Sequence, residues 1–105
     1  NQGRYNEALE QYKEAIRLKP DYSHPYHNIG HMLALTKRYK ESVAFYEKAQ
    51  KLNPYEWKTY QDLGQVYFLL GRYDEAKPQL LQAIKLGSTD SKKLQLILNK
   101  IEEVR

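Results

Sequence analysis

The sequence contains no cysteine, which excludes disulfide bonds, cysteine-based zinc sites and thiol nucleophiles. No apolar run approaches the roughly 20 residues that a membrane span needs, and no signal-peptide pattern stands at the start. The net charge of +4 in 105 residues is modest and favours solubility more than binding to nucleic acid. We therefore predict one domain over residues 1–105, in the cytoplasm, with neither a membrane nor a nucleic-acid partner.

What the chain does contain is an internal repeat of 34 residues. The segment GRYNEA at residues 3–8 returns as GRYDEA at residues 71–76, and KRYKES at residues 37–42 lies halfway between them. Three alanines keep the same spacing, namely Ala15, Ala49 and Ala83. The repeat predicts that the same structural unit is used several times along the chain.

Within each unit, apolar residues recur at intervals of three and four, as on one face of an α-helix. Pro20, Pro54, Gly71 and Gly87 mark the breaks between these stretches. The pattern predicts helices at residues 4–18, 23–36, 39–52, 57–70, 73–86 and 90–104.

Three residues conflict with a regular helix. Gly30 and Gly64 lie inside predicted helices, where glycine costs about 1 kcal/mol relative to alanine. We predict that they allow two helix backbones to approach each other closely. Pro78 removes one backbone hydrogen bond and predicts a bend in its helix.

The two complete units share a pattern of aromatic, aliphatic and glycine residues. It reads Tyr-x2-Ile-Gly-x2-Leu at residues 26–33 and Tyr-x2-Leu-Gly-x2-Tyr at residues 60–67, and Pro54 closes the first unit. This pattern resembles the tetratricopeptide repeat (TPR) over residues 1–90. The chain departs from that pattern at four positions: Lys37 for the turn glycine, Ser42 for alanine, Leu80 for an aromatic residue and Ser88 for proline.

The resemblance implies an all-α fold, a right-handed α-solenoid of antiparallel helix pairs. Residues 1–22 would form the second half of a repeat, residues 23–56 and 57–90 full repeats, and residues 91–105 a capping helix. The cap would bury Leu94, Ile97, Leu98, Ile101 and Val104.

The first predicted helix lacks the partner that would cover its apolar face, formed by Tyr5, Leu9, Tyr12 and Ile16. An uncovered face destabilises a repeat protein, since each repeat depends on its neighbours. We expect either a longer solenoid or another molecule, such as a second copy, to cover it.

In the TPR family the first helix of each pair lines a concave groove that receives an extended or helical peptide. The resemblance implies that this groove is lined by His24, His27, Asn28, His31, Leu35, Tyr55, Lys58, Gln61, Asp62, Gln65, Leu69, Lys92, Gln95 and Asn99. Side-chain amides suit a peptide backbone because they offer both a donor and an acceptor. The same residues are also compatible with an ordinary solvated helix face.

The predicted groove residues also allow three other interpretations. Asn28 and Lys58 match two positions of the clamp with which one TPR subgroup binds C-terminal carboxylates, but the acid at Asp62 argues against it. His27 and His31 could chelate a divalent metal, although no further ligand is arranged with them. Protonation of the three histidines could make binding depend on pH. We predict no metal site and no cofactor.

Catalysis is not predicted, because the sequence has neither a phosphate-binding loop nor a nucleophile elbow. Its basic residues alternate with glutamates at helical spacing, which is typical of a solvated face. We predict a protein-interaction module that binds a peptide segment of a protein partner. The alternative is a spacer inside a larger solenoid with no ligand of its own.

Overall fold

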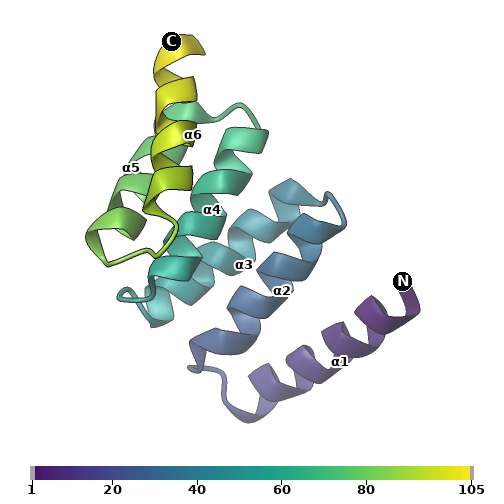
Figure 1. Cartoon of the computed structure of the whole chain (residues 1–105). Coiled ribbons are helices and arrows are strands. Elements are labelled where there is room, and N and C mark those ends of the chain that lie inside the picture. The colour runs from purple at the N-terminus through teal and green to yellow at the C-terminus, as the bar shows by residue number, and fades with distance from the viewer. Residues whose placement is uncertain (1, 105) are drawn as a thin grey trace. The chain divides into compact units, whose positions relative to one another are not determined.

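The computed structural model describes residues 2–104, and these form six α-helices and no strand (Figure 1). The helices are α1 (Gln2–Leu18), α2 (Ser23–Leu35), α3 (Tyr39–Leu52), α4 (Trp57–Leu69), α5 (Tyr73–Lys85) and α6 (Ser91–Val104). Every predicted helix is confirmed, and no end differs from its prediction by more than two residues. Helix α5 continues through Pro78.

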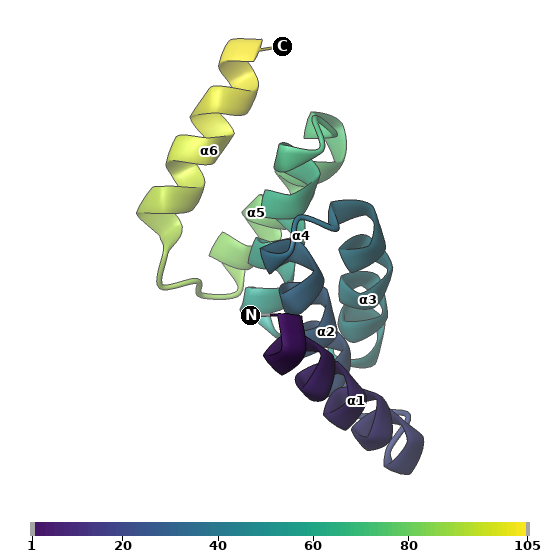
Figure 2. The same cartoon turned by 90° about the vertical axis from the view of Figure 1, so that its right-hand side faces the viewer.

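The chain divides into two compact units, unit 1 at residues 1–54 and unit 2 at residues 55–105. Each contains a hairpin of two closely packed helices, α2 with α3 in unit 1 and α4 with α5 in unit 2. A third helix completes each unit: α1 packs on α2, and α6 packs on α5 (Figure 2).

The core of unit 1 lies between α2 and α3, where Ile29, Leu33 and Tyr46 are almost completely buried. The Tyr46 ring lies directly on Gly30. A Cβ atom at residue 30 would come within 2.9 Å of the Tyr46 Cδ1 atom, closer than such atoms approach in proteins. Glycine is therefore needed here to admit the Tyr46 ring. Close contact between the two helix backbones stays a prediction.

Unit 2 repeats this arrangement with a different side chain. Leu63 and Leu80 are fully buried, and a Cβ atom at Gly64 would lie 2.6 Å from the Leu80 Cδ2 atom. Leu80 thus fills the space that Tyr46 fills in unit 1. The loss of the aromatic residue leaves the contact with glycine in place.

Both hairpins turn through a residue with a positive φ angle. Lys37 has φ 63° and Gly71, one repeat later, has φ 75°. In both turns the next residue closes a backbone hydrogen bond to the end of the preceding helix, from Arg38 to Leu33 at 2.8 Å and from Arg72 to Tyr67 at 2.9 Å. This is the Schellman end of a helix, which glycine adopts without strain and lysine does not.

The third helices differ in how much they bury. In α6, Leu94, Leu98 and Ile101 are buried as predicted, whereas Val104 is 60% exposed, so its place in the predicted core is wrong. Helix α1 contributes no buried side chain among the described residues. Six of its apolar residues are half-buried, namely Tyr5, Ala8, Leu9, Tyr12, Ala15 and Ile16, and Leu18 is 66% exposed.

Candidate functional site

The predicted groove residues of unit 1 lie on α2. His24, His31 and Leu35 are exposed, and His27 and Asn28 are half-buried. The His24 ring stacks on Tyr22 with ring centres 5.9 Å apart. This face of α2 therefore offers imidazole and amide groups with an apolar side chain at its C-terminal end.

His27 is held differently from the other two histidines. Its ring meets Tyr46 edge to face at 5.4 Å between ring centres, so it leans into the seam between α2 and α3. Within residues 2–104, no group of three or more His, Cys, Asp and Glu side chains is placed to hold a metal ion. The stripe of three histidines in the sequence is thus not a cluster of three outward-facing rings.

On α4, in unit 2, the structure corrects one predicted groove residue. Gln61 is only 6% exposed, and both ends of its amide are engaged. Its Nε2 donates to the Asp90 Oδ2 atom at 2.8 Å, and its Oε1 accepts from the Ser88 hydroxyl at 2.8 Å. Helical spacing placed Gln61 on an open face, but the turn before α6 folds over it.

One turn further along α4, Gln65 is half-buried and has an unusual amide. Its Nε2 atom is shielded from solvent and has no hydrogen-bond partner. Leu69, another turn along, is 58% exposed. Lys58 is exposed at the start of the helix and Asp62 is half-buried.

The remaining predicted residues lie at the margins of unit 2. Tyr55, before α4, is the most exposed large hydrophobic residue among those described, at 79%. On α6, Lys92, Gln95 and Asn99 are all exposed, and the Gln95 Nε2 atom donates to the Asn99 Oδ1 atom at 3.2 Å. These two amides are thus brought together one turn apart.

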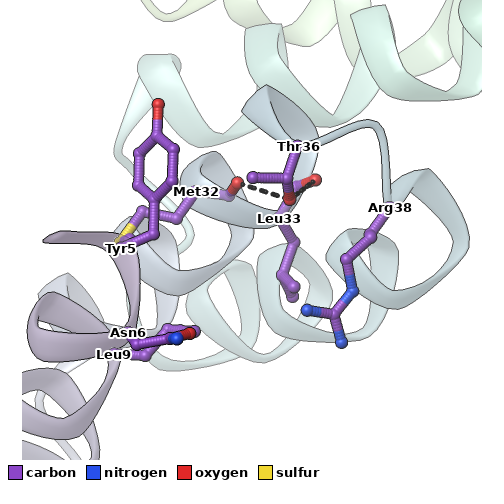
Figure 3. Close-up of a pocket in the computed structure, with 7 residues that line it drawn as sticks. All are labelled: Tyr5, Asn6, Leu9, Met32, Leu33, Thr36 and Arg38. Carbon is purple, nitrogen blue, oxygen red and sulfur yellow. Dashed lines mark hydrogen bonds between the residues drawn. The ribbon is translucent and has the colours of Figure 1, made fainter. Parts of the chain in front are cut away.

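A pocket that sequence reasoning missed lies between α1 and α2 in unit 1 (Figure 3). Its volume is about 280 Å³, and it is lined by Tyr5, Asn6, Leu9, Met32, Leu33, Thr36 and Arg38. The uncovered apolar face of the first predicted helix indicated only the α1 side of this pocket. Nothing in the spacing indicated that Thr36 and Arg38 would close the other side.

The repeated Arg-Tyr-x-Glu segment forms the same ion pair in both units. Arg38 donates two hydrogen bonds to Glu41, at 3.0 and 2.5 Å, and Arg72 donates two to Glu75, at 2.7 and 2.6 Å. These hydrogen bonds lower the pKa of each glutamate below its ordinary value. The motif therefore orders the first turn of the second helix in each hairpin.

The comparisons with known proteins agree with this architecture. A family model described as tetratricopeptide repeat matches residues 21–87, more than half of the chain, and one described as TPR repeat matches residues 1–37. The chain belongs to the tetratricopeptide repeat family. The predicted all-α helical solenoid is thereby confirmed, and TPR folds are in general non-catalytic protein-interaction modules.

Two solved structures illustrate the likeness to other TPR proteins. YrrB, described as a TPR protein with an unusual peptide-binding site, is 27% identical with a TM-score of 0.79, over 89% of this chain and 47% of YrrB. This TPR chain thus spans about half the length of YrrB. The TPR2B domain in the pHsp70 complex of yeast Sti1 is 19% identical with a TM-score of 0.87, over 99% and 87%, and shows the fold alone. A comparison with curated proteins finds no match.

None of the helices in the described part of this TPR chain is long and apolar enough to cross a membrane.

Proposed function

We propose that this TPR chain is a peptide-recognition module that binds an extended segment of a partner protein. Unit 1 would offer the face of α2 to such a segment, and unit 2 would offer the faces of α4 and α6. Hydrogen bonds to the peptide backbone would set its register, and Leu35, Phe68 and Leu69 would supply apolar contact. The peptide-binding site described for YrrB, a relative of the same family, supports this function.

The observation that carries the proposal is the amide of Gln65. A buried N–H donor without a partner destabilises a folded protein by about 1–3 kcal/mol. The Gln65 Nε2 atom is in this state, while Gln61 one turn earlier has both amide atoms engaged. A peptide carbonyl oxygen on this face would accept the missing hydrogen bond once the Gln65 side chain turns outward from its shielded position.

The neighbours of Gln65 indicate what else such a peptide would carry. Leu69 is exposed one turn further along the helix and would contact an apolar side chain of the ligand. On α6 the exposed amides of Gln95 and Asn99 would offer further donors and acceptors. In unit 1, Asn28 and the outward rings of His24 and His31 would likewise offer hydrogen-bond donors and acceptors.

The test is a substitution that removes the donor of Gln65 and keeps its length. Peptides of 12 residues selected from a random phage-displayed library against the whole chain serve as probes, with affinity measured by fluorescence anisotropy. Gln65→Met should weaken binding about 3- to 10-fold, which corresponds to one lost hydrogen bond. Gln82→Met on α5 is the matched control, since Gln82 is a half-buried glutamine outside the proposed faces.

The double variant Asn28→Ala and Asp62→Ala should also lose affinity while its far-UV circular dichroism stays unchanged. Selection that yields no peptide, or equal affinity for Gln65→Met and Gln82→Met, contradicts the proposal. That outcome would favour a spacer segment without a ligand of its own.

A further inference from the structure

The turn between α2 and α3 carries more positive charge than its equivalents in the other repeats. Lys37 stands where both other copies of the repeated segment have glycine, and Lys40 stands where they have asparagine or aspartate. We refer to these two lysines as the basic turn. The same two positions are exposed in all three copies, so their exposure is a property of the repeat.

Lys37 has a backbone conformation that favours glycine. Its φ angle is 63°, close to the 75° of the equivalent Gly71. A side chain in this left-handed conformation crowds the backbone, so lysine makes the turn less stable than glycine does. The dipole of α2 attracts a cation at this end of the helix, which offsets only part of the cost because the charge is exposed.

Lys40 is unfavourable for the helix that it begins. It is the second residue of α3, and the N-terminal end of a helix carries a partial positive charge. The equivalent residue of α5 is Asp74, whose negative charge interacts favourably with such an end. Unit 2 thus has the residue that stability favours at both positions, and unit 1 has lysine at both.

The two lysines are available to a ligand. Arg38, which lies between them, donates two hydrogen bonds to Glu41 and is neutralised by it. Among the described residues, neither lysine side chain has an ion pair or a hydrogen bond with another residue. The backbone of the turn is held to the end of α2 by the hydrogen bond from the Arg38 N–H to the Leu33 carbonyl at 2.8 Å. The turn therefore presents two unpaired cations on a fixed backbone.

This turn follows the α2 face proposed for peptide recognition. Leu35, the last residue of α2, is 56% exposed and lies two residues before Lys37. Two cations beside an apolar side chain suit a peptide that combines carboxylates with an apolar residue. They are few for nucleic acid, because binding to a phosphate backbone depends on the neutralisation of many phosphates.

We propose that the basic turn binds acidic side chains of the partner segment, next to the residue of that segment that contacts Leu35. The ligand is thus a peptide segment in which an apolar residue is flanked by aspartates or glutamates. This inference rests on the proposed peptide-recognition function and adds to it the chemistry of the partner. Unit 1 retains two unfavourable lysines because they bind, at a cost in stability that unit 2 does not have.

The test uses the peptide Glu-Asp-Gly-Leu-Gly-Asp-Glu and the whole chain, labelled with ¹⁵N, at 0.15 M salt. Two-dimensional NMR should show saturable shifts of the amide signals of residues 35–41. The same peptide with its four acids replaced by the matching amides should bind at least fivefold more weakly. Equal binding of the two peptides, or shifts confined to other residues, overturns the proposal.

The protein side is tested by giving unit 1 the residues of unit 2. Lys37→Gly and Lys40→Asp should each weaken binding of the acidic peptide about 3- to 10-fold. Lys51→Asp is the matched control, since it changes the charge equally at an exposed residue of α3. Lys51 lies roughly 16 Å along the helix from Lys40, beyond the screening length of about 8 Å. An equal loss in Lys51→Asp would reveal a general charge effect and overturn the proposal.

Stability separates a binding role from a structural one. Lys37→Gly and Lys40→Asp should raise the melting temperature while they weaken binding, because each removes a residue that is unfavourable for the fold. Loss of binding can then not be attributed to unfolding. A lower melting temperature in both variants would show that the lysines are kept for stability, and would overturn the proposal.

Failure of this inference is distinguishable from failure of the proposed function. Library peptides that respond to Gln65→Met but bind Lys40→Asp as tightly as the unchanged chain would overturn the acidic partner alone. A library that yields no peptide, with the acidic probe still bound at the turn, would contradict the proposed function alone. Tighter binding of a 12-nucleotide oligothymidine than of the acidic peptide, through the same two lysines, would overturn the proposal in favour of nucleic acid.

Discussion

Units 1 and 2 are each a helix hairpin with a third helix packed beside it, but the third helices are held differently. Helix α6 buries Leu94 and Ile101 completely, whereas none of the described apolar side chains of α1 is buried. The hairpins themselves agree closely, since both contain a glycine under a large side chain and an Arg–Glu pair at the second helix. The repeat therefore specifies the hairpin, and the third helices differ in how completely their apolar side chains are covered.

A closed set of hydrogen bonds holds the turn before α6. In unit 2 the Ser88 hydroxyl donates to Gln61, Gln61 donates to Asp90, and the Asp90 backbone N–H donates to Ser88 at 3.0 Å. These bonds fix the turn that leads into α6. The same positions one repeat earlier include His27, which contacts Tyr46, and Pro54, which has no hydroxyl. Replacing the family proline with Ser88 thus gives the turn before α6 a specific anchor.

The largest effect on stability is expected from substitutions in the third helices, α6 and α1. Leu94→Ala should lower the free energy of unfolding of unit 2 by about 2–5 kcal/mol, the usual loss for a fully buried leucine. Leu9→Ala in α1 should cost less than half as much, because Leu9 is half-buried beside a pocket that already exists. Urea unfolding followed by circular dichroism measures both. Equal losses would show that α1 is held as firmly as α6.

A smaller effect is expected from the turn before α6. Ser88→Ala leaves the buried Gln61 Oε1 atom without its donor and should destabilise α6 by about 1–2 kcal/mol. Amide hydrogen exchange in α6 should become correspondingly faster while α4 and α5 stay protected. The neighbouring Thr89→Ala is the control, since Thr89 is exposed. An unchanged rate of amide exchange in Ser88→Ala would show that the Ser88 hydroxyl does not help to hold α6 in place.

The smallest effect on stability is expected from substitutions in the two hairpin turns. Lys37→Gly should stabilise unit 1 by about 0.5–1 kcal/mol, because a residue with a side chain is strained at φ 63° and glycine is not. The reverse change, Gly71→Lys, should cost a similar amount in unit 2. Thermal unfolding of the two variants measures both signs. A fall in the melting temperature of Lys37→Gly would mean that the lysine side chain contributes a contact of its own.

Much of the fold was predictable, because the 34-residue register and the helical period repeat the same information several times. The α-helices, the breaks at Pro20 and Pro54 and the buried side of α6 follow from that periodicity. Periodicity gives the direction of a side chain around its helix. It does not give the path of a connecting turn.

The site was less predictable for this reason. Gln61 points to the outer side of α4 as its spacing requires, but the turn at Ser88 and Asp90 covers it. The isolated donor of Gln65 depends on what surrounds one atom, and no sequence spacing records that. The pocket at Arg38 similarly depends on how closely α1 approaches α2.

Helix α6 continues the repeat register with one change. Its Leu98 stands where α2 has Gly30 and α4 has Gly64, so the space above this helix is filled by its own side chain. A helix that packed on α6 as α3 packs on α2 would have to place a large side chain where Leu98 already lies. Interlocking of the repeat type therefore joins α2 with α3 and α4 with α5, and α6 cannot take the part of α2 or α4 because it carries Leu98 in place of the glycine.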